Sequence, residues 1–218
     1  MMLLRRSLLA AAAAALTAAA LPALAQEAES ADSAAEQMPE GKVLPDIALG
    51  QQDAPVTIIE YASFTCSHCA AFHEDNWPRL KSEYIDTGKV KFIQRDVYFD
   101  AVGLWAGILA RCGGEDKYYA VSDLIFADQK TWLDAKTGDE IAANLRKIGA
   151  KAGMTTEQMD ACWGDKQQVA DLVTTFQTNA SADGVEGTPT FIIDGEKVQN
   201  QPWEDLKKII DAKLAAKG

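Results

Sequence analysis

Basic residues are few in this chain, with 21 lysines and arginines against 32 aspartates and glutamates and a formal net charge of −11. A surface of this sign repels nucleic acid and anionic membranes, so we expect neither as a partner. After residue 25, no segment is apolar enough to cross a bilayer. The chain has no internal repeats, and its 218 residues suffice for one domain with a sizeable core, or for one domain carrying an insertion.

Histidine and cysteine are also scarce, with two histidines and four cysteines. The chain has one Cys-x-x-Cys pair, and a structural zinc site would need a second pair of ligands beside it. Cys112 and Cys162 do not form such a pair, and both histidines stand too close in sequence to the first pair. We therefore expect no metal and no other cofactor.

The Cys-x-x-Cys pair is Cys66 and Cys69, with His68 between the thiols. An apolar, β-branched run at 56–61 precedes it and a helical pattern follows it. A strand that turns into a helix at this motif is typical of a thioredoxin-like redox site. The first turn of a helix points unpaired N–H groups at the first sulfur and favours its thiolate. This arrangement predicts Cys66 as the nucleophile and Cys69 as the resolving thiol.

The N-terminus has the pattern of a secretory signal peptide. Arg5 and Arg6 precede a run of mostly alanine and leucine at 7–21, and a small-x-small site predicts cleavage after Ala25. The arginine pair also fits a twin-arginine signal, so the export route stays open between the two. We expect an exported chain, most naturally in the bacterial periplasm. Residues 26–42 have no apolar periodicity and predict a disordered lead-in.

Strand patterns fall into two groups that flank a long block of helical periodicity. The expected strands lie at 47–50, 56–61, 89–95, 190–193 and 197–198. The expected helices lie at 66–87 with a break near Pro78, and at 101–111, 116–126, 139–152, 155–163, 166–180 and 203–216. This order predicts an α/β thioredoxin fold with an inserted all-helical domain. The thioredoxin-like domain would comprise 43–98 and 184–218, and the helical insertion 99–183.

Three separated features make the resemblance specific: the active-site segment Cys66-Ser67-His68-Cys69, the segment Gly184-Val185-Glu186-Gly187-Thr188-Pro189-Thr190-Phe191, and the helical block between them. Together they resemble the DsbA family of periplasmic thiol–disulfide oxidoreductases. The resemblance covers the chain from about residue 43 to its C-terminus. It implies an oxidase that acts on unfolded or partly folded exported proteins, works as a monomer and is reoxidised by a membrane partner of the DsbB type.

The resemblance also assigns roles to residues outside the cysteine pair. It implies that Pro189 is a cis-proline opposite the cysteines, which leaves the backbone of Thr188 free to pair with an extended substrate. The alternative is an ordinary turn before the following strand. The family carries a buried acid at the position of Glu60, where it exchanges a proton with Cys69. The alternative there is a glutamate at a strand edge that points to solvent.

Two positions depart from the pattern of the family. Some relatives pair the buried acid with a lysine in the next strand, where this chain has Gln94 followed by Arg95. The best-known members have proline where Ser67 stands, so the redox potential can differ. The ring of His68 is expected to stabilise the thiolate of the nucleophile. We interpret His73 as a partly exposed helix residue with no catalytic task.

The remaining cysteines, Cys112 and Cys162, fall in two different predicted helices. In an exported chain they most simply form a structural disulfide, which would close a loop worth roughly 4 kcal/mol in the chain-entropy model. Two free buried thiols, or one exposed thiol used for signalling, are the alternatives.

Three functions compete at this point. The first is an oxidase that gives its Cys66–Cys69 disulfide to exported proteins. The second is a reductase or isomerase; isomerases of this superfamily usually carry an N-terminal dimerisation domain, and only about twenty residues separate the expected cleavage site from the first strand. The third is a non-catalytic, chaperone-like binder of unfolded chains, against which the complete set of redox residues argues.

Overall fold

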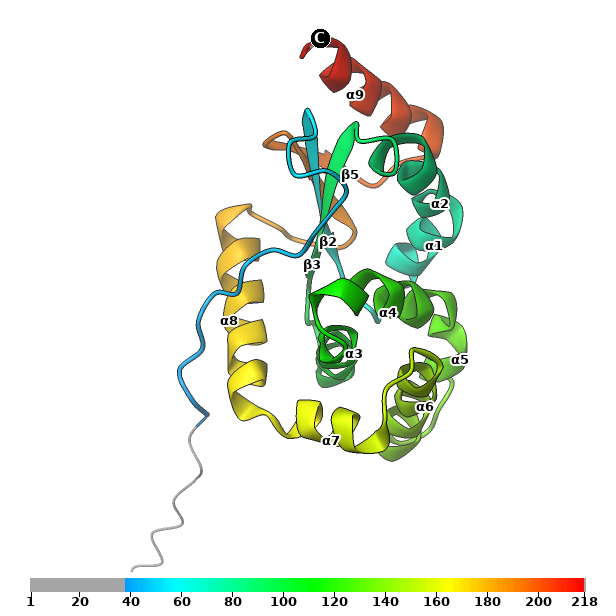
Figure 1. Cartoon of the computed structure of the whole chain (residues 1–218), viewed down its shortest axis with the longest axis vertical. Coiled ribbons are helices and arrows are strands. Elements are labelled where there is room, and N and C mark those ends of the chain that lie inside the picture. Colours follow the sequence, from blue (N-terminus) through cyan, green and yellow to red (C-terminus); the bar gives the residue numbers. More distant parts are fainter. Residues whose placement is uncertain (1–37, 218) are drawn as a thin grey trace, which may run out of the picture. The chain divides into compact units, whose positions relative to one another are not determined.

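The computed structural model describes residues 38–217, which form a mixed β-sheet with helices on both faces (Figure 1). The central strand is β2 (Val56–Ala62). It pairs in parallel with β3 (Val90–Asp96) and antiparallel with β4 (Thr190–Ile193). The short strands β1 (Ala48–Leu49) and β5 (Glu196–Gln199) form the two edges, which gives the order β1-β3-β2-β4-β5.

Alternate residues of β2 point to opposite faces of the sheet. On one face, Val56 and Ile58 belong to a core that also includes side chains of the covering helices. These helices are α1 (Ser67–Asp75), α2 (Trp77–Leu80), the π-helical turn η1 (Lys81–Ile85) and α9 (Trp203–Ala215). On the other face, Tyr61 and Ile192 pack against α8 (Lys166–Ala182). Glu60 shares the parity of Ile58 and therefore faces α1.

The remaining helices form a block beside the carboxyl end of β2, with a core of its own. They are α3 (Ala101–Cys112), α4 (Glu115–Ala127), α5 (Gln129–Leu133), α6 (Gly138–Lys151) and α7 (Thr156–Gly164). Side-chain caps fix where several of them begin. Thr155 and Gln158 form a capping box on α7, and Thr137 and Glu140 form a second one on α6, so each satisfies backbone N–H groups that the helix leaves free.

The α/β class and the expected order of elements are confirmed, with small shifts at the ends of elements. The sequence pattern missed α5, because a helix of five residues is too short to display its period. The helix expected over 66–87 is divided into α1, α2 and η1, and the break lies at Asn76. Pro78 sits in the first turn of α2, where its missing N–H costs no hydrogen bond, so the helix divides two residues before the proline.

The lead-in differs from expectation at its end. Its first part, like the expected signal peptide at 1–25, lies outside the described residues. Residues 40–42 run along α8 in defined contacts. The backbone N–H of Lys42 donates to Asp171 at 2.9 Å, and Gln167 donates to the carbonyl of Glu40 at 3.0 Å. Gly41 lies so close to α8 that a Cβ there would stand 2.2 Å from the carbonyl oxygen of Ala170.

A disulfide joins Cys112, the last residue of α3, to Cys162 in α7. Their Cα atoms lie 5.8 Å apart and their sequence separation is 50. A second contact ties the same helices, because the indole of Trp163 donates to the carbonyl of Trp105 at 3.0 Å. Two helices that are distant in sequence are therefore held together both covalently and by a hydrogen bond.

We expect the double substitution Cys112→Ala, Cys162→Ala to lower the free energy of unfolding by about 4 kcal/mol, since it releases a long closed loop in the unfolded chain. Urea unfolding of both proteins measures the difference. The exchange rate at Cys66 per folded molecule should stay close to that of the parent. In the parent protein, thiol counting after mild reduction and denaturation should find two free thiols per chain, those of Cys66 and Cys69. Four thiols, or equal stability of the two proteins, would contradict this assignment.

Candidate active site

The two cysteines of the motif sit where β2 leads into α1, and they differ sharply in exposure. Cys66 is the N-cap of α1, in extended conformation, and is partly exposed, whereas Cys69 is fully buried one turn into the helix. The buried Phe64 anchors the connecting loop in the core of the helical block. An incoming thiol can therefore reach the first sulfur and not the second.

The surroundings move the pKa values of the two thiols in opposite directions. The pKa of Cys66 is lowered to about 5, chiefly because the Cys69 thiol donates a hydrogen bond to it. Partial burial opposes this shift, while the Thr188 side chain and the backbone N–H groups of Cys69 and His68 add to it. Burial raises the pKa of Cys69 well above its ordinary range, and the nearby charge of Glu60 raises it further. At neutral pH the reduced site holds a thiolate at Cys66 and a thiol at Cys69.

The expected ring contact of His68 is not among the largest causes of the low pKa of Cys66. The side chain of His68 is exposed at the start of α1, and its backbone N–H is the group that stabilises the thiolate. The helix terminus thus stabilises the Cys66 thiolate regardless of which side chain stands at position 68.

The segment before β4 lies directly beside the nucleophile. The Thr188–Pro189 peptide bond is cis, and the carbonyl oxygen of Thr188 lies 3.4 Å from the Sγ of Cys66. Thr188 is partly exposed and Pro189 is buried. The structure thus brings a backbone edge and the reactive sulfur together, although they are 122 residues apart in sequence.

Glu60 is completely buried beneath α1, so the solvent-facing alternative is wrong. Gln94 stands opposite it in the parallel pairing of β2 with β3. The amide of Gln94 donates to Asp96 at 3.0 Å and to the hydroxyl of Tyr118 at 3.1 Å, rather than to the acid. The neighbouring strand therefore supplies no charge partner for Glu60.

The expectation that His73 is partly exposed is wrong. His73 is buried, and its Nε2 lies 3.0 Å from the Oε2 of Glu60. Its ring stacks on Phe126 of α4 at 4.0 Å between ring centroids. The signal was present in the sequence, because His73 follows Cys69 by four residues and so shares its helix face. A histidine on the helix face that covers a buried acid is well placed to form a hydrogen bond with that acid.

Gln129, the first residue of α5, is a further site residue that the sequence pattern missed. It is buried, and its Nε2 donates to the carbonyls of Phe64 and Cys66, each at 2.9 Å. These bonds fix the loop that carries the nucleophile. Gln129 lies between two helices expected from the sequence, and no periodicity or motif there marked it as a site residue.

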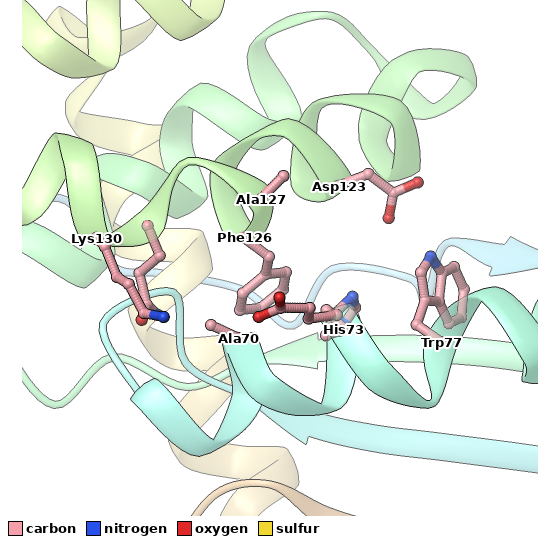
Figure 2. Close-up of a pocket in the computed structure, with 9 residues that line it drawn as sticks. Ala70, His73, Trp77, Asp123, Phe126, Ala127 and Lys130 are labelled. Carbon is pink, nitrogen blue, oxygen red and sulfur yellow. The ribbon is translucent and has the colours of Figure 1, made fainter.

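A cavity of about 490 Å³ lies behind the active-site helix, between α1 and the helices α4 and α5 (Figure 2). His73 lines it from α1, Trp77 from α2, and Asp123 and Phe126 from α4. Burial raises the pKa of Asp123. Across residues 38–217, no group of three or more histidine, cysteine, aspartate or glutamate side chains could hold a metal ion.

Comparison with known proteins agrees with this geometry. The sequence model of the family described as Thioredoxin matches residues 42–212, well over half of the chain. A Rickettsia bellii protein, named as a candidate protein-disulfide oxidoreductase, is 30% identical over 167 residues, which are 76% of this chain and 63% of that protein. The chain thus spans somewhat less than two thirds of that relative. Disulfide bond formation protein D of Bacillus subtilis is 25% identical over 178 residues, 78% of this chain and 77% of that protein.

Among solved structures, the chain is similar to alpha-DsbA1 of Wolbachia pipientis. The TM-score is 0.72 and the identity is 27%, covering 80% of this chain and 94% of that one. A sheet with the Cys-x-x-Cys motif at its central β–α junction, opposite a cis-proline segment, defines the thioredoxin-like class of redox proteins. The chain belongs to the thioredoxin family, and its resemblance within that family is to the DsbA proteins.

We expect Cys66 to be alkylated and Cys69 to be spared in a brief iodoacetamide pulse on the reduced protein, with the sites mapped by mass. The rate should fall by half near pH 5, because the thiolate is the reactive form. A folded pKa below the unfolded one also stabilises the reduced fold. That stabilisation is full above about pH 8.5, the pKa of a free thiol, and is lost as the pH falls through about 5. First labelling at Cys69 would refute the assignment.

We expect Gln129→Glu to lower the free energy of unfolding by about 1–3 kcal/mol, because two buried carbonyls lose their donor without any change in side-chain size. Chemical denaturation of the reduced protein measures it. Lys130→Gln is the matched control, since Lys130 is the exposed neighbour in α5 and should change stability little. Equal effects of the two substitutions would show that the bonds of Gln129 do not hold the loop.

Proposed function

We propose that the chain is a thiol–disulfide oxidoreductase of the DsbA type that donates its Cys66–Cys69 disulfide to reduced substrate proteins. The observation that carries the proposal is the opposite shift of two neighbouring thiol pKa values, down at the partly exposed Cys66 and up at the buried Cys69. This difference makes one sulfur the site of attack and the better leaving group, and keeps the other protonated. The names of the relatives support the same chemistry.

The reaction proceeds in two exchanges. A substrate thiolate attacks the Sγ of Cys66, a bond forms between these sulfurs, and the Cys66–Cys69 bond breaks. The sulfur of Cys69 takes the electron pair and one proton. A second substrate thiolate then attacks the substrate sulfur of the mixed disulfide, and Cys66 leaves as the stable thiolate. The substrate loses two electrons and the enzyme gains them.

The low pKa of Cys66 sets the direction of electron flow. Every interaction that stabilises its thiolate stabilises the reduced enzyme, and this makes the disulfide a stronger oxidant. The Cys69 thiol, the Thr188 side chain and the N-terminus of α1 all act in this way. An oxidase is therefore favoured over a reductase.

The backbone edge at Thr188 is the proposed docking position for the substrate. Its carbonyl lies beside the attacked sulfur, so an extended peptide that pairs there would present its own cysteine to Cys66. Backbone pairing reads no side chain, and this suits an enzyme that acts on many unfolded chains.

The cellular setting follows from the same proposal. An oxidase of this kind works on exported proteins in the periplasm and returns two electrons per turnover to a membrane reoxidant of the DsbB type. The N-terminal signal pattern supports export. Within residues 38–217, no helix is both long and apolar enough to span a membrane.

We expect the reduction potential of the Cys66–Cys69 pair, measured by equilibration with glutathione, to lie above the value of about −270 mV that is typical of thioredoxin. The oxidised protein should also oxidise a reduced, unfolded protein faster than glutathione disulfide does. A potential at or below that of thioredoxin would favour the reductase alternative. Cys66→Ser should abolish exchange.

Two substitutions test what stabilises the thiolate. Thr188→Val removes a hydroxyl without changing shape and should lower the potential by about 30 mV, which corresponds to tenfold in the equilibrium constant. His68→Ala keeps the backbone N–H and should lower the potential by less. A larger effect of His68→Ala would assign the dominant role to the imidazole ring.

A further inference from the structure

We propose that His73 is a positioning residue that relays protons between the buried pair Glu60–Cys69 and the solvent in the cavity behind α1. This inference rests on the proposed thiol–disulfide exchange and adds a path for its proton. The path begins at a group that no solvent reaches, because Glu60 and Cys69 both have no exposed surface. The proton that the sulfur of Cys69 takes up must therefore arrive through the protein.

The contacts of Glu60 restrict how that proton can arrive. Its Oε2 bonds to the Nε2 of His73 at 3.0 Å, while its Oε1 is buried with no hydrogen-bond partner among the described residues. One oxygen is thus committed to the imidazole and the other is free to serve the thiol. Glu60 and Cys69 are both completely buried where α1 covers β2, and the charge of Glu60 raises the pKa of Cys69. Gln94, across the strand pair, donates its amide hydrogens to Asp96 and Tyr118 and carries no titratable proton to supply.

The other end of the path is the cavity of about 490 Å³, to which His73 contributes a wall. Figure 2 shows His73 projecting from α1, Trp77 from α2, and Phe126 reaching toward them from α4, and the ring of His73 packs against both aromatic rings. The Nδ1 of His73 is closed to solvent and has no partner among the described residues, so a water from the cavity must move within hydrogen-bond reach of it to exchange a proton. An imidazole that holds an acid at one nitrogen and has the other nitrogen free is suited to passing a proton through its ring.

Other ionisable groups lie around the ring and the cavity. The groups that face His73 or the cavity from the packed elements are Glu60 of β2, Cys69 and Glu74 of α1, Asp123 of α4 and Lys130 of α5.

The proton count is balanced in each exchange. When the Cys66–Cys69 bond breaks, Oε1 of Glu60 gives a proton to the sulfur of Cys69, Nε2 of His73 gives one to Oε2, and a water that enters from the cavity gives one to Nδ1. On reoxidation the same three transfers run in reverse, and Cys69 becomes a thiolate that can attack the mixed disulfide at Cys66. No electron passes through the relay.

The test measures single-turnover reduction of the oxidised protein by a small dithiol, with rates normalised to the thiolate concentration. It runs over about pH 5 to 8, where imidazoles exchange protons, in H₂O and D₂O. We expect the wild-type protein to show a solvent isotope effect. We expect His73→Gln, which keeps a donor for Glu60 but cannot relay a proton, to be reduced about 10–100-fold more slowly than the wild-type protein. This factor is at or below the smallest effects typical of general acid–base catalysis, about 100-fold. The wild-type rate should depend on pH over this range because the relay carries a proton, and Glu60→Gln should remove that dependence.

The remaining variants separate a relay from a structural role. His73→Phe keeps a ring on Phe126 and should match His73→Gln in rate. Asp123→Asn is the control, since Asp123 lines the cavity without bonding Glu60 in the structure, and it should keep the isotope effect. If His73→Gln has the wild-type rate, pH profile and isotope effect, the hydrogen bond alone suffices and the relay is refuted.

One measurement needs no substitution at the relay. The chain has two histidines, so in His68→Gln the single imidazole signal in NMR belongs to His73. The relay leaves the ring with the same number of protons but moves one from Nε2 to Nδ1, so the tautomer seen in the ring nitrogen signals should change when the cysteine pair is reduced, and an unchanged tautomer would refute the relay. Absence of any exchange at Cys66 in the wild-type protein would instead refute the proposed function, so the two failures are distinguishable.

Discussion

The burial of Cys69 beside Glu60 is the constraint on which the site depends. A thiol with no access to water keeps its proton, and a thiol that keeps its proton can donate it as a hydrogen bond to the sulfur next to it. The low pKa of Cys66 follows from this asymmetry more than from any single charged neighbour. The redox character of the protein is thus a consequence of how tightly α1 covers the end of β2.

Much of the fold could be predicted from the sequence because its signals are local. The run at 56–61 has the composition of a buried strand, the Thr155–Gln158 pair caps its own helix, and the loop from Gly184 to Pro189 carries a recognisable pattern. Such features depend on residues close together in the chain. The buried position of Glu60 was predicted from the resemblance to the DsbA family, and its solvent-facing alternative was left open.

The rest could not be predicted because it depends on packing between distant segments. Gln129 reaches the carbonyls of Phe64 and Cys66 across more than sixty residues, and no pattern around it announces this. The partner of Glu60 was sought on the neighbouring strand, at Gln94, yet it comes from α1 as His73. Sequence patterns can predict which strands pair. They do not predict whether the partner of a buried side chain comes from a helix or from a strand, because that depends on how the elements pack.

The two bonds of Gln129 connect the helical block to the loop that carries the nucleophile. The position of this loop at Cys66 therefore depends on the first residue of α5, a helix far from it in sequence. Mutations that shift α5 would change the reactivity of the Cys66 sulfur without changing the Cys-x-x-Cys motif. Variation in the helical block is thus a route by which proteins with the same motif can differ in chemistry, and α5 is a position from which a designer could adjust the reactive sulfur.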